Sequence, residues 1–221
     1  MMKVRFEYPD IPIMHIENIC VVGEFNNFNT GYTNLVKNNN TWSCEIELDE
    51  GTYLYKFIIN NYMYLNDPNA NAYHTRGEEV WSYINVSQMP VENSKGKITY
   101  LRHIITNRMA TSLTMTGTYK EFYMKIDRKV VLGMEWDPIE GLHEVCVIWY
   151  RPDTLIHHIS YEIIQVIENE SKAGTTWFWM PLDEEGREYI EGIWNVVICV
   201  DGISIMADQF RLNGRVLERQ Y

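Results

Sequence analysis

The sequence has no long apolar run and only four cysteines. No segment approaches the roughly 20 apolar residues that a membrane-spanning helix needs, and residues 1–20 lack the apolar core of a secretion signal. The cysteines lie far apart and form no C-x-x-C pair, which favours free, buried thiols over disulfides or zinc ligands. We therefore expect a cytoplasmic protein that uses no metal or other cofactor. The cysteines are Cys20, Cys44, Cys146 and Cys199.

Basic residues are scarce as well. The 221-residue chain has 19 lysines and arginines against 30 aspartates and glutamates, a net charge of −11. Nucleic acid and anionic membranes would repel such a chain, so neither is an expected partner. A neutral polyhydroxyl ligand makes no long-range electrostatic demand, and 15 tyrosines and 7 tryptophans supply rings on which a sugar can stack.

Signatures of catalysis are also missing. The sequence contains no G-x-S-x-G, no H-E-x-x-H and no phosphate-binding glycine loop. His157 and His158 are neighbours in a predicted strand and point to opposite faces, so they form no chelating pair. The carboxylates of 183–185 could act on a glycosidic bond, but a solvated turn explains them more simply. We predict that the protein is not an enzyme; a small glycan-acting enzyme is the weakest alternative.

Long helical stripes are absent, and short β-type runs separated by turn signals take their place. The pattern predicts an all-β chain of two tandem immunoglobulin-like β-sandwich domains, at 1–90 and 91–221, joined by the linker-like residues 87–97. In the first domain, strands are expected at 19–23, 41–48, 52–59, 62–65 and 80–86. In the second, they are expected at 118–126, 129–136, 142–150, 156–167, 175–180, 194–200 and 203–212.

Several motifs of the first domain occur in a characteristic order. V-V-G-E-F-N-N-F-N at 21–29 is followed by T-W-S at 41–43, L-D-E-G-T-Y-L-Y-K-F at 48–57 and N-D-P at 66–68. Together they resemble the glycogen-binding domains of carbohydrate-binding module family 48. That family includes the β subunit of AMP-activated protein kinase and accessory domains of branching and debranching enzymes. The resemblance covers residues 15–88 and implies a non-catalytic module that recognises an α-glucan such as glycogen or a starch-like oligosaccharide.

The resemblance also implies which residues contact the sugar. In the family, two aromatic side chains stack on the sugar, a lysine donates to its hydroxyls, and an asparagine pair closes the site. The first stacking position is Phe28 and the second is Tyr64, with Tyr62 or Met63 as alternatives. The remaining matched positions are Lys56, Trp81 and Ser82, with Arg76 on the preceding loop.

Four of these positions depart from the family pattern. Phe28 and Tyr64 stand where tryptophans are usual, and Ser82 reaches less far than asparagine. Trp81 adds a ring that the family does not normally have. These changes imply weakened or redirected glucan binding. The alternative is that Phe28 and Tyr64 are loop anchors and Lys56 an ordinary strand lysine, in a scaffold or protein-interaction protein that keeps the fold without binding sugar.

The second domain resembles, more loosely, the immunoglobulin-like sandwiches that accompany binding modules. Its W-Y-R-P-D turn at 149–153 and its closing hairpin near 192–210 specify geometry and not chemistry. Trp177 and Trp179 share one strand face and Phe178 the other. We expect the two tryptophans to lie in the core, because a sandwich of this size needs large apolar side chains. Another protein is a possible partner for this domain.

Overall fold

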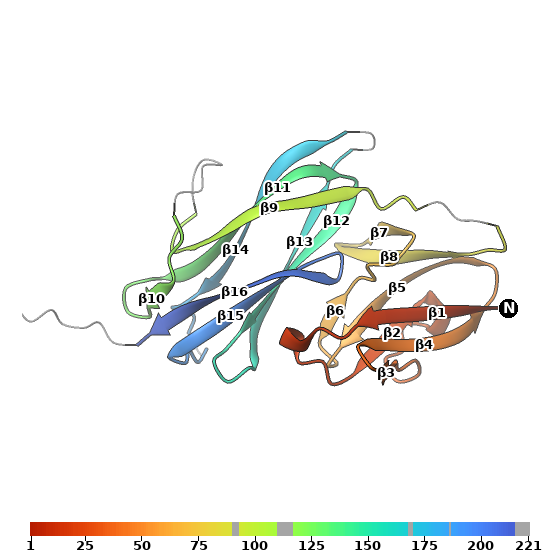
Figure 1. The fold of residues 1–221 in the computed structure, drawn as a ribbon, viewed down its shortest axis with the longest axis horizontal. Helices are drawn as coiled ribbons and strands as arrows, with labels where there is room; N and C mark the ends of the chain where they lie inside the picture. The colour runs from red at the N-terminus through yellow and green to blue at the C-terminus, as the bar shows by residue number, and fades with distance from the viewer. Residues whose placement is uncertain (90–92, 110–116, 168–169, 186, 215–221) are drawn as a thin grey trace, which may run out of the picture.

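A computed structural model describes residues 1–89, 93–109, 117–167, 170–185 and 187–214 (Figure 1). The fold is all-β, as the sequence predicts. Besides its strands, the described part of the chain contains two 3₁₀ turns, at Pro12–Met14 and Glu24–Asn26. It contains no helix with the length and apolar character of a membrane span. The four cysteines are free thiols, and Cys20, Cys146 and Cys199 are buried, as predicted.

The strands before residue 90 form two antiparallel sheets, with the orders β1-β4-β3 and β2-β5-β8-β7; the short β6 pairs with β5. Alternation along β1 and β5 turns Phe6, Tyr8, Tyr55 and Phe57 inward, where their rings pack edge to face. The strands are β1 (Met2–Pro9), β2 (Ile19–Gly23), β3 (Val36–Asn38), β4 (Thr41–Leu48), β5 (Gly51–Ile59), β6 (Met63–Leu65), β7 (Ala72–Arg76) and β8 (Glu79–Val86).

The strands after residue 96 form a three-stranded sheet, β14-β11-β9, and a five-stranded sheet, β10-β16-β15-β12-β13. Between them lies a core with Trp136, Trp149, Trp194 and Phe210. The strands are β9 (Lys97–Thr106), β10 (Glu121–Tyr123), β11 (Lys129–Glu140), β12 (Leu142–Tyr150), β13 (Ile156–Gln165), β14 (Lys172–Pro181), β15 (Gly192–Val200) and β16 (Ile203–Asn213).

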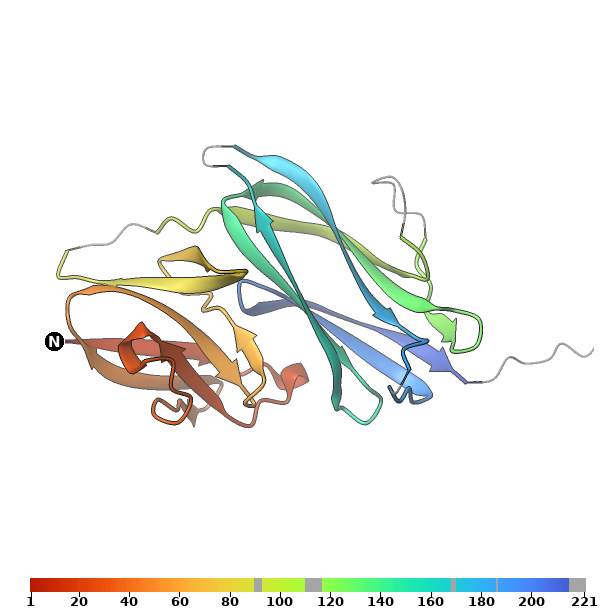
Figure 2. The same cartoon turned by 180° about the vertical axis from the view of Figure 1, so that it is seen from behind.

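The second sandwich packs directly against the first. Cys146, Ile148 and Val197, on the outward side of the five-stranded sheet, belong to the same buried cluster as Tyr8 and Phe57. Figures 1 and 2 show the turn between β15 and β16 reaching the strands of the first sandwich. The division of the chain into domains at 1–90 and 91–221 remains a prediction.

The expectation for the paired tryptophans of β14 was wrong. Phe178, opposite Leu132, is the residue that enters the core, whereas Trp179 is 49% exposed. The ring of Trp177 lies over Gly133 on the outward side of the sheet, where a Cβ at position 133 would be only 2.5 Å from it. The period of two identifies residues that share a face, but not which face is buried.

Candidate functional site

The sheet β2-β5-β8-β7 presents one side to the core and the other side outward. Because side chains alternate, Tyr55 and Phe57 point inward and the intervening Lys56 points outward. The ladder places Tyr55 opposite Ser82 and His74 opposite Trp81, so Trp81 is on the outward side. We call this side the outer face; its residues are Lys56, Ile58, His74, Arg76, Trp81 and Tyr83.

Phe28 reaches the outer face from the loop after the second 3₁₀ turn. Asn27 and Phe28 both adopt left-handed backbone conformations, with φ of 52° and 57°. The N–H of Phe28 donates to the carbonyl of Gly23 at 2.9 Å. Its ring then packs edge-on against Trp81, with centroids 5.3 Å apart and planes at 80°.

Arg76 covers both rings. Its guanidinium carbon lies 4.1 Å from the centroid of Phe28 and 5.4 Å from that of Trp81. A second pair, His74 and Tyr83, lies on the same face with centroids 4.6 Å apart. Arg76 and His74 are exposed. Three of the predicted site residues, Phe28, Arg76 and Trp81, therefore converge on one side of the sheet. Trp81 is only 9% exposed there, because Phe28 and Arg76 pack against its ring.

Lys56 was predicted to donate to sugar hydroxyls, a role that requires an exposed side chain. Its side chain is buried, at 2% exposure for the residue, and its Nζ lies 5.4 Å from the ring centroid of Trp81. Nζ is also 3.3 Å from Glu144 Oε1 of β12 and 3.6 Å from Glu79 Oε2. The second sandwich thus supplies a buried carboxylate that engages this lysine. Lys56 connects the outer face to the junction instead of standing free in solvent.

Ser82 does not lie on the outer face, contrary to the prediction. It is 0% exposed, because it alternates with Trp81 along β8 and points inward. Its hydroxyl accepts the N–H of Asp67 at 2.6 Å and donates to Asn66 Oδ1 at 3.1 Å. Ser82 therefore stabilises the N-D-P turn through these two hydrogen bonds, and its buried hydroxyl cannot contact a ligand.

Asp67 in this turn is a buried carboxyl. Burial raises its pKa to about 6, although the N–H of Asn69 and the hydroxyl of Tyr55 both donate to it and oppose the rise. Asn66 Nδ2 donates to Glu144 Oε2 at 3.1 Å, so the turn also contacts the second sandwich. The turn is part of the junction as well as of the first sandwich.

Tyr64 and Lys56 both line a hollow between the two sandwiches. Tyr64 is 42% exposed and Tyr62 is 51% exposed, whereas Met63 is buried and is excluded as a surface platform. The hollow has a volume of about 460 Å³. We call it the cleft; its lining residues are Lys56, Tyr62, Tyr64, Glu78, Glu79, Glu144, Ile159, Tyr161 and Ile163.

Sequence reasoning missed several residues of the outer face and cleft, among them His74, Tyr83, Glu144 and Tyr161. The positions of His74 and Tyr83 follow from strand alternation once Trp81 and Arg76 are known to face outward. Glu144 and Tyr161 come from the second sandwich, and no local signal connects them to Lys56, which is 88 positions from Glu144.

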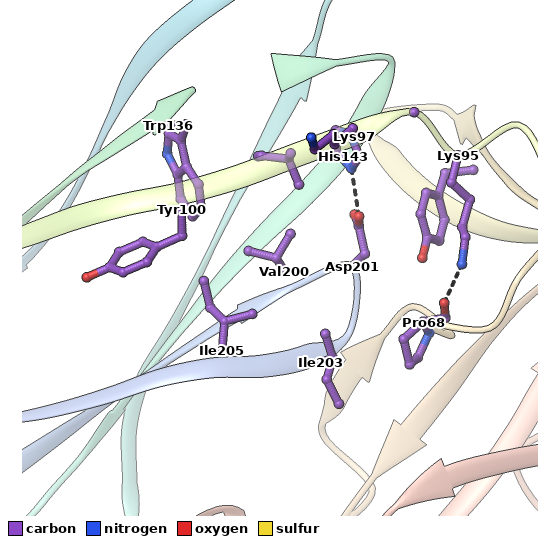
Figure 3. A pocket seen from close by; sticks show the side chains of 13 residues that line it. Pro68, Lys95, Lys97, Tyr100, Trp136, His143, Val200, Asp201, Ile203 and Ile205 are labelled. Atoms are coloured by element: carbon purple, nitrogen blue, oxygen red, sulfur yellow. Dashed lines mark hydrogen bonds and ion pairs between the residues drawn. The ribbon is translucent and has the colours of Figure 1, made fainter. Parts of the chain in front are cut away.

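A second hollow, of about 340 Å³, lies elsewhere at the junction (Figure 3). Most of its polar side chains already have partners. His143 Nδ1 is 2.6 Å from Asp201 Oδ2 and its Nε2 is 2.8 Å from the carbonyl of Glu140. Burial opposes a charge on His143, but these two acceptors outweigh it and raise its pKa. Lys95 Nζ donates to the carbonyl of Pro68. This hollow therefore offers few free polar groups to a ligand.

Comparison with known proteins identifies the segment that carries the outer face. Residues 14–92 match the family model described as the glycogen recognition site of AMP-activated protein kinase. This confirms the resemblance drawn from the sequence motifs over the first sandwich. We refer to residues 14–92 as the matched module. No curated protein matches the chain.

Several solved structures are similar to the chain at low identity. A maltogenic amylase from S. marinus is 13% identical, with 90% of this chain and 25% of that chain covered and a TM-score of 0.34. A β-glucosidase from Listeria innocua in complex with glucose is 12% identical over 64% of this chain and 20% of that chain, with a TM-score of 0.37. An immunoglobulin-like protein from Pseudomonas aeruginosa is 16% identical over 54% of this chain and 94% of that chain, with a TM-score of 0.32.

The chain thus spans a quarter of the amylase's length and a fifth of the glucosidase's. At such low identity and TM-score, these likenesses identify no function for the chain. Within the described residues, no group of three or more histidine, cysteine, aspartate or glutamate side chains is arranged to hold a metal ion.

Proposed function

We propose that the matched module, residues 14–92, binds an α-glucan, such as glycogen or a starch-like oligosaccharide, on its outer face, and that the chain is a non-catalytic binding protein. The observation that carries the proposal is the convergence of Phe28, Arg76 and Trp81 on the solvent side of the sheet. Phe28 and Trp81 are positions that the family resemblance assigns to the sugar site, and Arg76 is the residue that was expected beside them.

The chemistry of the outer face fits a sugar. A pyranose ring has an apolar C–H face that stacks on aromatic rings, and a belt of hydroxyls that needs hydrogen-bonding groups. Phe28, Trp81 and the His74–Tyr83 pair provide the rings. Arg76, which is exposed, provides the donors.

The guanidinium of Arg76 lies over Phe28 and Trp81 in the structure, where a bound sugar would stack on these rings. An exposed cation–π contact contributes only about 0.5–1 kcal/mol. We infer that the guanidinium turns aside when the sugar stacks and then donates to its hydroxyls. Trp81 takes the place of the usual family residue, so the chain keeps a large ring on this face although Phe28 is smaller than tryptophan.

Native electrophoresis in gels that contain glycogen tests the proposal. The whole chain is expected to migrate more slowly as glycogen is added, and Trp81→Ala and Phe28→Ala to lose most of this retardation. The loss corresponds to at least about a tenfold weaker dissociation constant. Trp179→Ala, which removes an exposed ring of the second sandwich, is the matched control and should be retarded like the unchanged chain.

Retardation that survives both Trp81→Ala and Phe28→Ala would place the sugar elsewhere. A complete lack of retardation of the unchanged chain by glycogen or soluble starch would overturn the proposal. The scaffold interpretation, in which the module keeps its fold without binding sugar, would then be favoured.

A further inference from the structure

The cleft has an unusual concentration of exposed apolar and aromatic surface. Tyr62 and Tyr64 come from the first sandwich, and their side chains are 51% and 42% exposed. Tyr161 and Ile163 come from β13 of the second sandwich and are 42% and 37% exposed. Contiguous exposed side chains of this kind mark binding sites more often than plain surface. Both sandwiches contribute to this one.

The polar groups of the cleft suit a ligand with many hydroxyl donors. Glu78 and Glu79 line it with exposed carboxylates. Glu144 also lines it, but it is buried and paired with Lys56, the one cation among the lining residues. This excess of carboxylate repels anions, while carboxylate oxygens accept hydrogen bonds from sugar hydroxyls. Aromatic walls over an acidic floor therefore match a neutral polyhydroxyl chain.

The cleft is also continuous with the outer face. Lys56 lines the cleft, and its Nζ lies 5.4 Å from the ring centroid of Trp81. Glu79 lies opposite Arg76 in the β7–β8 ladder, and its carboxylate is 3.6 Å from the same Nζ. Glu79 and Lys56 therefore lie where the outer face adjoins the cleft.

We propose that the second sandwich completes the glucan site: a chain of sugars bound on the outer face continues into the cleft and stacks on Tyr161. This inference rests on the proposed function and extends it to the second sandwich. It makes Tyr161 and Ile163 residues that select for longer oligosaccharides. Short oligosaccharides occupy the outer face alone and do not reach β13.

Tyr161 is held in place for this role. Its hydroxyl lies beside the backbone of Tyr64 and the thiol of Cys146, and burial of this end raises its pKa. The residue as a whole is 42% exposed and lines the cleft. A ring fixed at its buried end loses little conformational entropy when a sugar stacks on the open side, which favours binding.

Calorimetric titration of the whole chain with maltotriose and with maltoheptaose tests the inference. Tyr161→Ala is expected to weaken maltoheptaose binding by about tenfold and to leave maltotriose binding unchanged. The matched control is Tyr119→Ala, because Tyr119 is 47% exposed and does not line the cleft. Ile163→Glu, at an exposed position of the cleft wall, is a second variant that should also weaken binding of the longer sugar selectively.

The outcomes separate the two proposals. If the unchanged chain binds neither sugar, the proposed function itself fails. If it binds maltoheptaose and both Tyr161→Ala and Ile163→Glu bind it equally well, the proposed function stands and the role of the second sandwich is overturned. Thermal unfolding shows whether each variant is folded. If one of the two variants is unfolded, the binding data of the folded one test the role of the second sandwich.

Discussion

Lys56 and Glu144 are both buried, at 2% and 4% exposure, and their charged atoms are 3.3 Å apart. A buried ion pair costs desolvation energy, and its net contribution to stability is small or even unfavourable. Removing one partner destabilises the fold strongly, because the other charge is then buried without compensation. Loss of sugar binding in a Lys56 variant therefore does not by itself identify Lys56 as a sugar contact.

The free energy of unfolding is expected to depend on pH through Glu144. Burial raises its pKa from 4.5 to about 7, with Asp201 and Glu79 adding to the rise and Lys56 opposing it. Between these values the folded chain holds a proton that the unfolded chain has released. The contribution of Glu144 to stability is therefore present below about pH 4.5 and falls as pH rises towards 7.

Glu144→Gln removes this titrating group. Between about pH 4.5 and 7, the free energy of unfolding should decrease less for Glu144→Gln than for the unchanged chain. The two decreases should differ by up to about 3 kcal/mol. Urea unfolding at several pH values measures the difference, with the exposed Glu50→Gln as the control. Parallel pH profiles for the unchanged chain and Glu144→Gln would contradict the assigned shift.

At the scale of elements, the β15–β16 turn is the most constrained part of the junction. Asp201 and Gly202 both have positive φ, 51° and 85°, as a two-residue hairpin turn of type I′ requires. The carbonyl of Gly202 accepts the hydroxyl of Tyr8 at 2.6 Å. A Cβ on Gly202 would lie 1.7 Å from the backbone oxygen of Asn66, which has little freedom to move.

Gly202→Ala is therefore expected to destabilise the chain strongly, by about 4 kcal/mol or more, because backbone strain and overlap with the first sandwich add together. Gly77→Ala is the matched control. Gly77 also has a positive φ, 64°, but a Cβ added there would meet no atom within 4 Å. It should cost only about 1–2 kcal/mol. Equal melting temperatures for the two variants would show that the turn does not hold the sandwiches together.

Most elements could be predicted from the sequence, because alternation and turn residues are local signals. The bounds expected for β2, β4 and β12 agree with the structure. The turn at Asn60 and Asn61 has positive φ at both residues, which asparagine tolerates better than most residues. β1, β3, β7 and β9 were missed. β3 and β7 are short and end in exposed polar side chains, so no apolar alternation marks them, and β9 begins at Lys97, inside the stretch interpreted as linker.

At the scale of the whole molecule, the candidate site was only partly predictable. Phe28, Arg76 and Trp81 meet because they are carried by neighbouring elements of one sandwich, and the family resemblance already assigned Phe28 and Trp81 to one site. The burial of Lys56 could not be foreseen, because its partner Glu144 comes from the other sandwich. The packing of the two sandwiches around a common apolar cluster decides which matched residues face solvent.

The most direct test of sugar binding on the outer face is a nuclear magnetic resonance titration of the whole chain with maltoheptaose. Saturable shifts are expected for Phe28, His74 and Arg76 and for the indole N–H of Trp81. The indole N–H of Trp194, which donates to the carbonyl of Ile190 in the core of the second sandwich, should not move. Unchanged spectra at millimolar sugar, or shifts confined to residues far from the outer face, would contradict the account.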